Sequence, residues 1–227
     1  MIRGMPRTLL LLLLLFAPLR ATSQAAGNLD VTPVRQWIAK QDDLHSLSAD
    51  FVQTRSFHAL KSPLENKGHI WFSAPDSFRW QIGDPARAIA LKMGGFIYLI
   101  DPAKKKAVRS LADSVGKQAG MRGMPMMSFP MARSYADFEK QFQLLSVKTT
   151  GGECAISMLP RDVQARKFLK QINLAFHTDN GQLIYFEMVV RDGSSMRNDF
   201  ENVHVNEKLD RSTFNYDLTG YTITDAK

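Results

Sequence analysis

The side chains that usually carry catalysis lie far apart along this chain. No two of its five histidines have the HxxxH or HExxH spacing of zinc sites: His45, His58, His69, His177 and His204. No GxSxG motif is present, and the single cysteine, Cys154, has no histidine near it in the sequence. Cys154 alternates with Ile156 and Met158, which is typical of a small core residue. The sequence therefore predicts a binding protein without a catalytic site, a metal or a cofactor.

Aromatic side chains are the more informative group. Between Gly68 and Trp80 a proline turn separates two short runs that contain Trp71, Phe78 and Trp80. In the second run a period of two puts Phe78, Trp80 and Ile82 on one face and Arg79 on the other. Such an apolar face is either an ordinary sheet core or the wall of a cavity.

Methionines gather in a second region. Five of the nine methionines after residue 25 fall between positions 121 and 131, among glycines and prolines, within an interruption of the strand pattern at 111–142. Flexible thioether side chains suit an apolar surface that must repack around varied partners. The segment is either a mobile surface loop or a lid made of Met121, Met124, Met126, Met127, Phe129 and Met131.

Short strands dominate the elements that must position these side chains. A helix is expected over 33–45, and a second short helix over 135–142. About ten or eleven strands are expected, with Gly-Gly, Asn-Gly and Asp-Gly pairs at the hairpins. The spacing predicts a mainly β (α+β) fold, built as one large, strongly curved antiparallel sheet or an open barrel.

The first residues have the pattern of a secretory signal. Arg3 and Arg7 precede an apolar run that is too short to span a bilayer, and cleavage is expected after Ala25. Removal of residues 1–25 lowers the formal charge from +7 to +4, because three arginines and no acid are lost. We therefore expect a soluble exported domain over 26–227 with no nucleic-acid partner. No cysteine lies near the cleavage site to carry a lipid anchor.

Several segments in order resemble the LolA-type outer-membrane lipoprotein carriers of Gram-negative bacteria. They are the run from Leu47 to Gln53, Gly68-x-Ile-Trp71-Phe, Pro75-x-x-Phe78-Arg79-Trp80, Asn198-Asp-Phe200 and Phe214. The resemblance covers nearly the whole mature chain. It implies an incomplete antiparallel β-barrel of about ten or eleven strands, with short helices that form a lid over its opening.

The resemblance also implies a function. The protein would be a periplasmic monomer that receives lipoprotein acyl chains from an inner-membrane ABC transporter and passes them to an outer-membrane acceptor. Phe51, Trp71, Phe78 and Trp80 match the family's aromatic positions and, with Ile82, are the expected cavity residues. Some members of the family carry a basic residue immediately before the motif proline, and this chain has Ala74 at that position. Arg79 is expected either to make a polar contact at the edge of the barrel or to be a solvated arginine. Another acylated lipid as cargo, or a lipid-binding stress-sensor domain, are alternatives.

Overall fold

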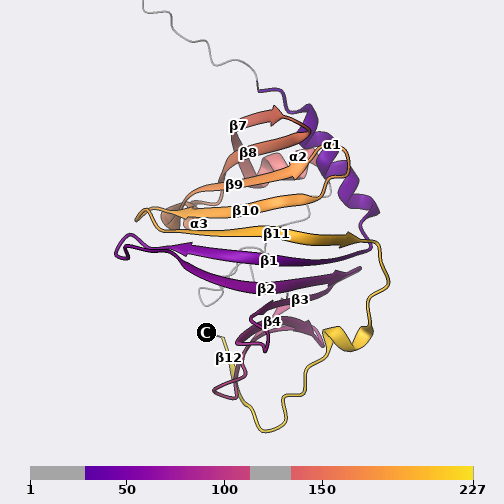
Figure 1. Ribbon diagram of the computed structural model, residues 1–227, viewed down its shortest axis with the longest axis vertical. Helices are drawn as coiled ribbons and strands as arrows, with labels where there is room; N and C mark the ends of the chain where they lie inside the picture. Colours follow the sequence, from indigo (N-terminus) through magenta and orange to yellow (C-terminus); the bar gives the residue numbers. More distant parts are fainter. Residues whose placement is uncertain (1–28, 113–133, 227) are drawn as a thin grey trace, which may run out of the picture.

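A computed structural model describes residues 29–112 and 134–226, and twelve strands in it form one open sheet (Figure 1). The strand order is β12-β6-β5-β4-β3-β2-β1-β11-β10-β9-β8-β7. The strands are β1 (Ser46–Ser56), β2 (Leu64–Ser73), β3 (Ser77–Ile82), β4 (Ala88–Met93), β5 (Phe96–Asp101), β6 (Lys106–Leu111), β7 (Phe142–Thr150), β8 (Glu153–Pro160), β9 (Leu169–His177), β10 (Leu183–Val190), β11 (Ser195–Val205) and β12 (Thr222–Asp225).

Glycine pairs make the expected hairpins. Gly94 and Gly95 join β4 to β5, and Gly151 and Gly152 join β7 to β8; all four have positive φ, which costs glycine little. The predicted mainly β fold with an open, curved antiparallel sheet is confirmed. The sheet has one strand more than the largest expected number, because β12 adds to its edge in parallel with β6.

Three α-helices are present in the described residues, and two of them were predicted. The first, α1 (Thr32–Lys40), has Pro33 in its first turn and ends earlier than predicted, since a 3₁₀ turn follows at Gln41–Asp43. The second, α2 (Tyr135–Gln141), begins where the Ser134 side chain accepts a hydrogen bond from the backbone of Asp137. The unpredicted α3 (Val163–Phe168) is capped by Asp162 and connects β8 to β9.

The alternation of side chains gives the sheet two distinct faces. We call the face that bears Phe51, Trp80 and Phe176 the inner face, and the opposite one the outer face. Helices α1 and α2 cover the inner face of β7–β10 and contribute Trp37 and Phe138 to the largest core cluster. On the outer face of β4–β6, a separate cluster includes side chains of the C-terminal segment that precedes β12, namely Tyr216, Leu218 and Tyr221.

The ends of the strands form two rims (Figure 1). The α1 rim is where β1 begins, and it contains the connections 41–45, 74–76, 94–95, 151–152, 178–182 and 206–210. The α3 rim is where β1 ends, and it contains 57–63, 83–87, 102–105, 161–168 and 191–194. Strands that lie far apart in the sequence therefore present their loops together at one rim or the other.

Candidate functional site

Four of the five predicted cavity residues meet on the inner face. The rings of Phe51 and Trp80 are stacked with their centroids 4.0 Å apart, and both are buried. Phe78 and Ile82 flank Trp80 on β3 and pack against the same cluster. Gly68 makes this possible, because a Cβ at its position would lie 2.3 Å from the Phe51 ring. The glycine lets a large ring lie flat across the backbone of β2.

Trp71 lies on the other side of the sheet, so it does not belong with these four residues. It is opposite Arg79 in the ladder between β2 and β3, whereas its neighbour Ile70 is opposite Trp80. Its ring stacks on His69 with centroids 5.4 Å apart, and the Arg79 guanidinium lies 5.6 Å from its centroid. Placing Trp71 among the inner-face residues was wrong, since a residue next to Ile70 in a strand must face the opposite way.

Arg79 connects the outer face to the C-terminal segment. One of its terminal nitrogens donates to the Thr213 carbonyl at 3.0 Å, and the other donates to the Gln81 side chain at 2.7 Å. Burial lowers the pKa of the Arg79 guanidinium, although its ordinary pKa is so high that it keeps its charge. Of the two alternatives expected for Arg79, the structure has the polar contact, and the acceptor is a carbonyl of the 3₁₀ turn at Arg211–Phe214.

A cavity of about 340 Å³ opens at the α1 rim, and its lining does not include any of the five residues that were expected to form a cavity. Its apolar lining comes from four remote parts of the chain: Leu44, Leu47, Ala49, Ile70, Leu183, Phe200, Val203 and Val205. Polar groups border it, among them Lys40, Asp43, Asp179, Asn180, Gln182 and Asn206. An apolar hollow with a polar border is suited to an apolar chain that carries a polar head.

The cavity leads directly to the aromatic cluster. Ala49 and Ile70 line the cavity and also belong to the core cluster that contains Phe51 and Trp80. Phe200 also lines the cavity, and it contacts the Phe51 ring edge-on at 6.4 Å between centroids. One continuous apolar surface therefore runs from the α1 rim to the predicted aromatic residues.

Side-chain hydrogen bonds hold the border of the cavity. The Asn206 amide accepts from the backbone of His45 at 2.8 Å and donates to the Asp43 carbonyl at 2.9 Å, which fixes the start of β1 against the end of β11. Lys40 donates to the carbonyls of Thr178 and Asp179, so the end of α1 is tied to the β9–β10 hairpin.

Polar side chains end the apolar surface further along β1. Gln53 is buried on the inner face and donates to the Asn198 side chain at 3.0 Å, and Arg55 donates to Gln53 at 2.7 Å. These groups lie beyond Phe51, towards the α3 rim. The apolar surface along β1 is therefore open at the cavity and bounded by amides at its other end.

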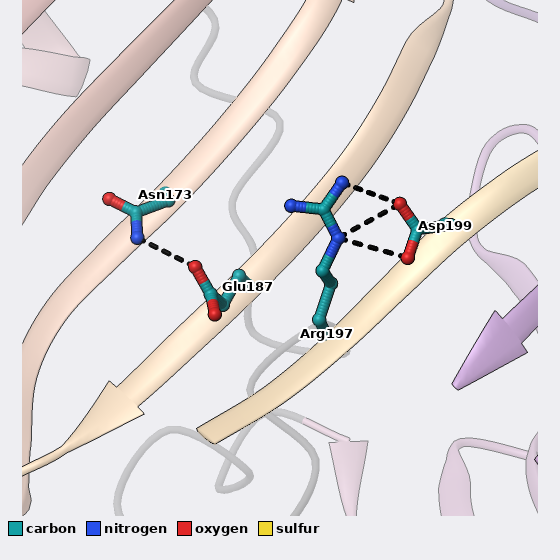
Figure 2. Close-up of polar contacts among 4 residues, drawn as sticks. All are labelled: Asn173, Glu187, Arg197 and Asp199. Atoms are coloured by element: carbon teal, nitrogen blue, oxygen red, sulfur yellow. Dashed lines mark hydrogen bonds and ion pairs between the residues drawn. The ribbon is translucent and has the colours of Figure 1, made fainter. Parts of the chain in front are cut away.

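The outer face of β9–β11 is hydrophilic (Figure 2). Asn173 donates to Glu187 at 2.8 Å, and Arg197 donates to both carboxylate oxygens of Asp199. The Arg197 guanidinium also lies 3.7 Å from the centroid of the Tyr185 ring, and the Asp199 carboxylate raises its pKa. In this part of the sheet, apolar and polar surfaces are thus separated onto opposite faces.

Cys154 is fully buried in the core, and burial raises the pKa of its thiol, which disfavours the reactive thiolate. No cluster of metal-ligating side chains occurs within the described residues. The six predicted lid residues, from Met121 to Met131, lie outside the described residues, so the lid stays a prediction. The signal peptide also lies outside them, and no helix in the described part is long and apolar enough to span a bilayer.

Two relatives with similar sequences share one description. An outer-membrane lipoprotein carrier protein from Chromohalobacter salexigens is 23% identical over 202 residues, which cover 88% of this chain and 87% of the relative. Another from Alkalilimnicola ehrlichii is 32% identical over 77 residues, 34% of this chain and 36% of the relative. A solved structure of an uncharacterized conserved protein from Thermus thermophilus has a TM-score of 0.50 at 8% identity, covering 83% of this chain and 94% of its own, and it shows the fold alone.

The model of one family, described as outer membrane lipoprotein carrier protein LolA, matches residues 42–217. The match includes the strands that carry Phe51, Phe78 and Trp80 and most of the cavity lining. The chain therefore belongs to the LolA family of outer membrane lipoprotein carrier proteins.

Proposed function

We propose that this protein carries lipoproteins across the periplasm with their acyl chains held against the inner face. The family consists of carriers and is not an enzyme family, which supports lipoprotein or lipid carriage in general. The observation that carries the proposal is the apolar cavity at the α1 rim and its continuity with the cluster of Phe51 and Trp80. In this proposal acyl chains enter at the α1 rim and extend towards Gln53.

The size of the cavity bears on how cargo is released. Its volume of about 340 Å³ lies near the lower end of the range for small-molecule pockets, which is about 300–1,000 Å³. Each buried methylene contributes about 0.8 kcal/mol, so complete sequestration of several acyl chains would bind cargo too tightly for transfer. We propose that part of the acyl moiety enters the cavity and that further chains need the inner face to open.

A binding assay tests the acyl-chain site. An apolar fluorescent probe should bind the wild type and be displaced by a triacylated lipopeptide. Val203→Phe places a larger side chain in the cavity and should weaken probe binding about tenfold or more, while Val52→Phe on the outer face serves as the matched control. The site proposal fails if both variants bind the probe like the wild type.

A second variant tests the aromatic cluster itself. Phe78→Leu keeps an apolar side chain beside Trp80, so the fold should be retained while the contact with a bound acyl chain is reduced. Weaker probe binding with unchanged circular dichroism is the expected result. Unchanged binding in this variant would exclude Phe78 from the site.

The cargo and the route are tested in cells. Mass spectrometry of lipids that co-purify with the protein should find lipoprotein acyl moieties; another lipid in their place would identify a carrier with different cargo. The proposed donor is an inner-membrane ABC transporter and the proposed acceptor is in the outer membrane. Depletion of the protein should then leave outer-membrane lipoproteins in the inner-membrane fraction, and unchanged sorting would contradict the route.

A further inference from the structure

The two rims of the sheet carry opposite charge. Within the described residues, the α3-rim connections contain eight cations, all exposed: Lys61, Arg87, Lys104, Lys105, Arg161, Arg166, Lys167 and Arg191. The acids there are Asp84, Asp162 and Asp192, so the difference of eight and three gives a net charge of +5. The described α1-rim connections contain one cation, Lys208, and six acids: Asp42, Asp43, Asp76, Asp179, Glu207 and Asp210. One minus six gives −5.

Most of the basic charge at the α3 rim has no carboxylate partner. Within the described residues, only Lys104 of the eight cations forms an ion pair, with Asp101. Arg161 and Arg191 instead donate to the main-chain carbonyls of Glu139 and Arg166. The positive potential of this rim is therefore available to an anionic partner.

Large apolar side chains project from the same rim. Phe57 and Leu60 on the β1–β2 hairpin are 42% and 50% exposed, Leu64 at the start of β2 is 51% exposed, and Val163 on α3 is 67% exposed. Each of them lies within a few residues of an exposed lysine or arginine. Apolar tips beside basic groups are the composition of a surface that inserts shallowly into a lipid headgroup layer.

These projections belong to one contiguous surface. The backbone of His58 on the β1–β2 hairpin donates to the Ser194 hydroxyl of the β10–β11 hairpin at 3.4 Å. In turn, the backbone of Arg191 donates to the Phe168 carbonyl at the end of α3 at 2.9 Å. Figure 1 shows the β1–β2 hairpin and α3 at the same end of the sheet.

We infer that the α3 rim is a docking surface for a lipid bilayer that contains anionic headgroups. The cations are spread over all five of the connections named above, which fits the broad negative charge of a membrane surface. Four of the eight are lysines, a residue type that is depleted in protein interfaces, where the charge must be dehydrated. A bilayer surface, rather than an acidic protein, is therefore the partner that these residues fit.

The opposite charge of the α1 rim fixes the orientation. An anionic surface attracts the α3 rim and repels the α1 rim, so the docked molecule holds the cavity mouth away from the bilayer. A protein partner can then reach the mouth while the carrier rests on the membrane. This inference needs no bound cargo, so its test is independent of the proposed acyl-chain site.

The test measures binding of the cargo-free mature protein to vesicles. Wild type should float with vesicles that contain phosphatidylglycerol but not with vesicles of phosphatidylcholine alone. Binding should be lost at about 1 M NaCl, where the Debye length is about 3 Å. Absence of binding to anionic vesicles at low salt would overturn the inference, and an acidic protein would then be the favoured partner of the α3 rim.

Matched charge reversals locate the surface. Lys61→Glu/Lys167→Glu alters the α3 rim, and Lys148→Glu/Lys208→Glu makes the same change in net charge at exposed positions towards the α1 rim. One cation near an anionic membrane strengthens binding about fivefold, so the first variant should lose about 25-fold or more and the second about twofold or less. Equal losses in both variants would overturn the inference, because only net charge would then matter.

A separate pair of variants tests the exposed apolar side chains of the α3 rim. Leu60→Ser should weaken binding to anionic vesicles, whereas Leu145→Ser, at a residue of similar exposure on β7, should not. Addition of anionic vesicles should also slow amide exchange at 57–63 and 191–194 but not at 178–182. Protection of 178–182 alone would reverse the orientation and contradict the inference.

Discussion

At the scale of single residues, the inner-face site depends on one glycine. Gly68 lies under the Phe51 ring, and a Cβ there would also lie 2.3 Å from the carbonyl oxygen of Gln81. Its φ is not in the left-handed region, so the need for glycine comes from the close approach of the ring and not from the backbone conformation. The stacking of Phe51 on Trp80 therefore relies on the absence of a side chain on the neighbouring strand.

Gly68→Ala should destabilise the protein by about 1–3 kcal/mol, because it overpacks the space under Phe51. Urea unfolding measures this change. In the double variant Gly68→Ala/Phe51→Leu the smaller side chain relieves the contact, so the two changes should cost less together than their sum. Additive effects would show that the ring and the glycine do not interact.

The outer face contains an acid whose ionisation is linked to stability. The Asn202 side chain donates to the Asp50 carboxylate at 2.8 Å, and this hydrogen bond, followed by the contact with His69, lowers the pKa of Asp50 below its ordinary 3.8. A carboxyl group with a depressed pKa in the folded state adds stability above its unfolded-state pKa. That contribution is lost as the pH falls through the folded-state pKa.

Asn202→Gly tests this linkage, since glycine tolerates the positive φ of 49° at this position. The variant should be less stable than the wild type near neutral pH. The difference in unfolding free energy should shrink as the pH falls below about 3.8 and through the lower folded-state pKa of Asp50, because the carboxyl group then becomes protonated in both folded proteins. A stability difference that does not change with pH would show that Asn202→Gly acts through the backbone conformation and not through the ionisation of Asp50.

At the scale of elements, α1 is the helix that closes the inner face next to the cavity. The Trp37 ring stacks on Phe176 of β9 with centroids 4.9 Å apart, and its indole nitrogen donates to the Gly181 carbonyl at 3.0 Å. Lys40, at the end of the helix, lines the cavity and binds the same hairpin. One turn of α1 thus fixes both the core and the border of the cavity.

Trp37→Phe should keep the stacked ring and lose the hydrogen bond, at a cost of about 1 kcal/mol plus a small packing loss. Trp37→Ala should cost about 3–5 kcal/mol, since it also leaves a cavity in the largest core cluster. Thermal and urea unfolding of the two variants measure the costs. Equal costs would mean that the ring contributes nothing beyond its hydrogen bond.

At the scale of the whole molecule, a continuous sheet joins two halves with separate cores. The inner-face cluster under α1 and the outer-face cluster under Tyr216 lie at opposite ends of the strand order. Strands β1, β2 and β11 connect them through long ladders, and the cluster of Phe51 and Trp80 lies between them. We propose that residues 26–227 fold as one domain.

A single cooperative unfolding transition is the expected outcome for the mature chain. Tryptophan fluorescence, which reports on Trp37 in the core under α1 and on Trp71 and Trp80 on the connecting strands β2 and β3, should coincide with far-ultraviolet circular dichroism in urea. Two separated transitions would show that the halves unfold independently despite the shared sheet.

The sequence by itself determined most of the strands and the relative faces within each strand. Period-two alternation and glycine turns depend on neighbouring residues only, so the hairpins at Gly94 and Gly151 and the opposed placement of Trp80 and Arg79 were predicted and are confirmed. The short β12 was missed because its four residues are all exposed and show no alternation. Its place is decided by the ladder to β6 and the ion pair between Arg109 and Asp225.

Only the tertiary structure decided which residues of different strands share a face or a rim. Trp71 was grouped with Phe78 because both match aromatic positions of the family, yet the ladder between β2 and β3 places it on the outer face. The cavity is formed by residues 40–49, 179–183 and 200–206 together with Ile70, and the opposite charges of the rims arise from loops scattered along the chain. Local sequence sets the conformation of each strand, but hydrogen bonds between remote strands set their register and order, and these long-range pairings assemble the site.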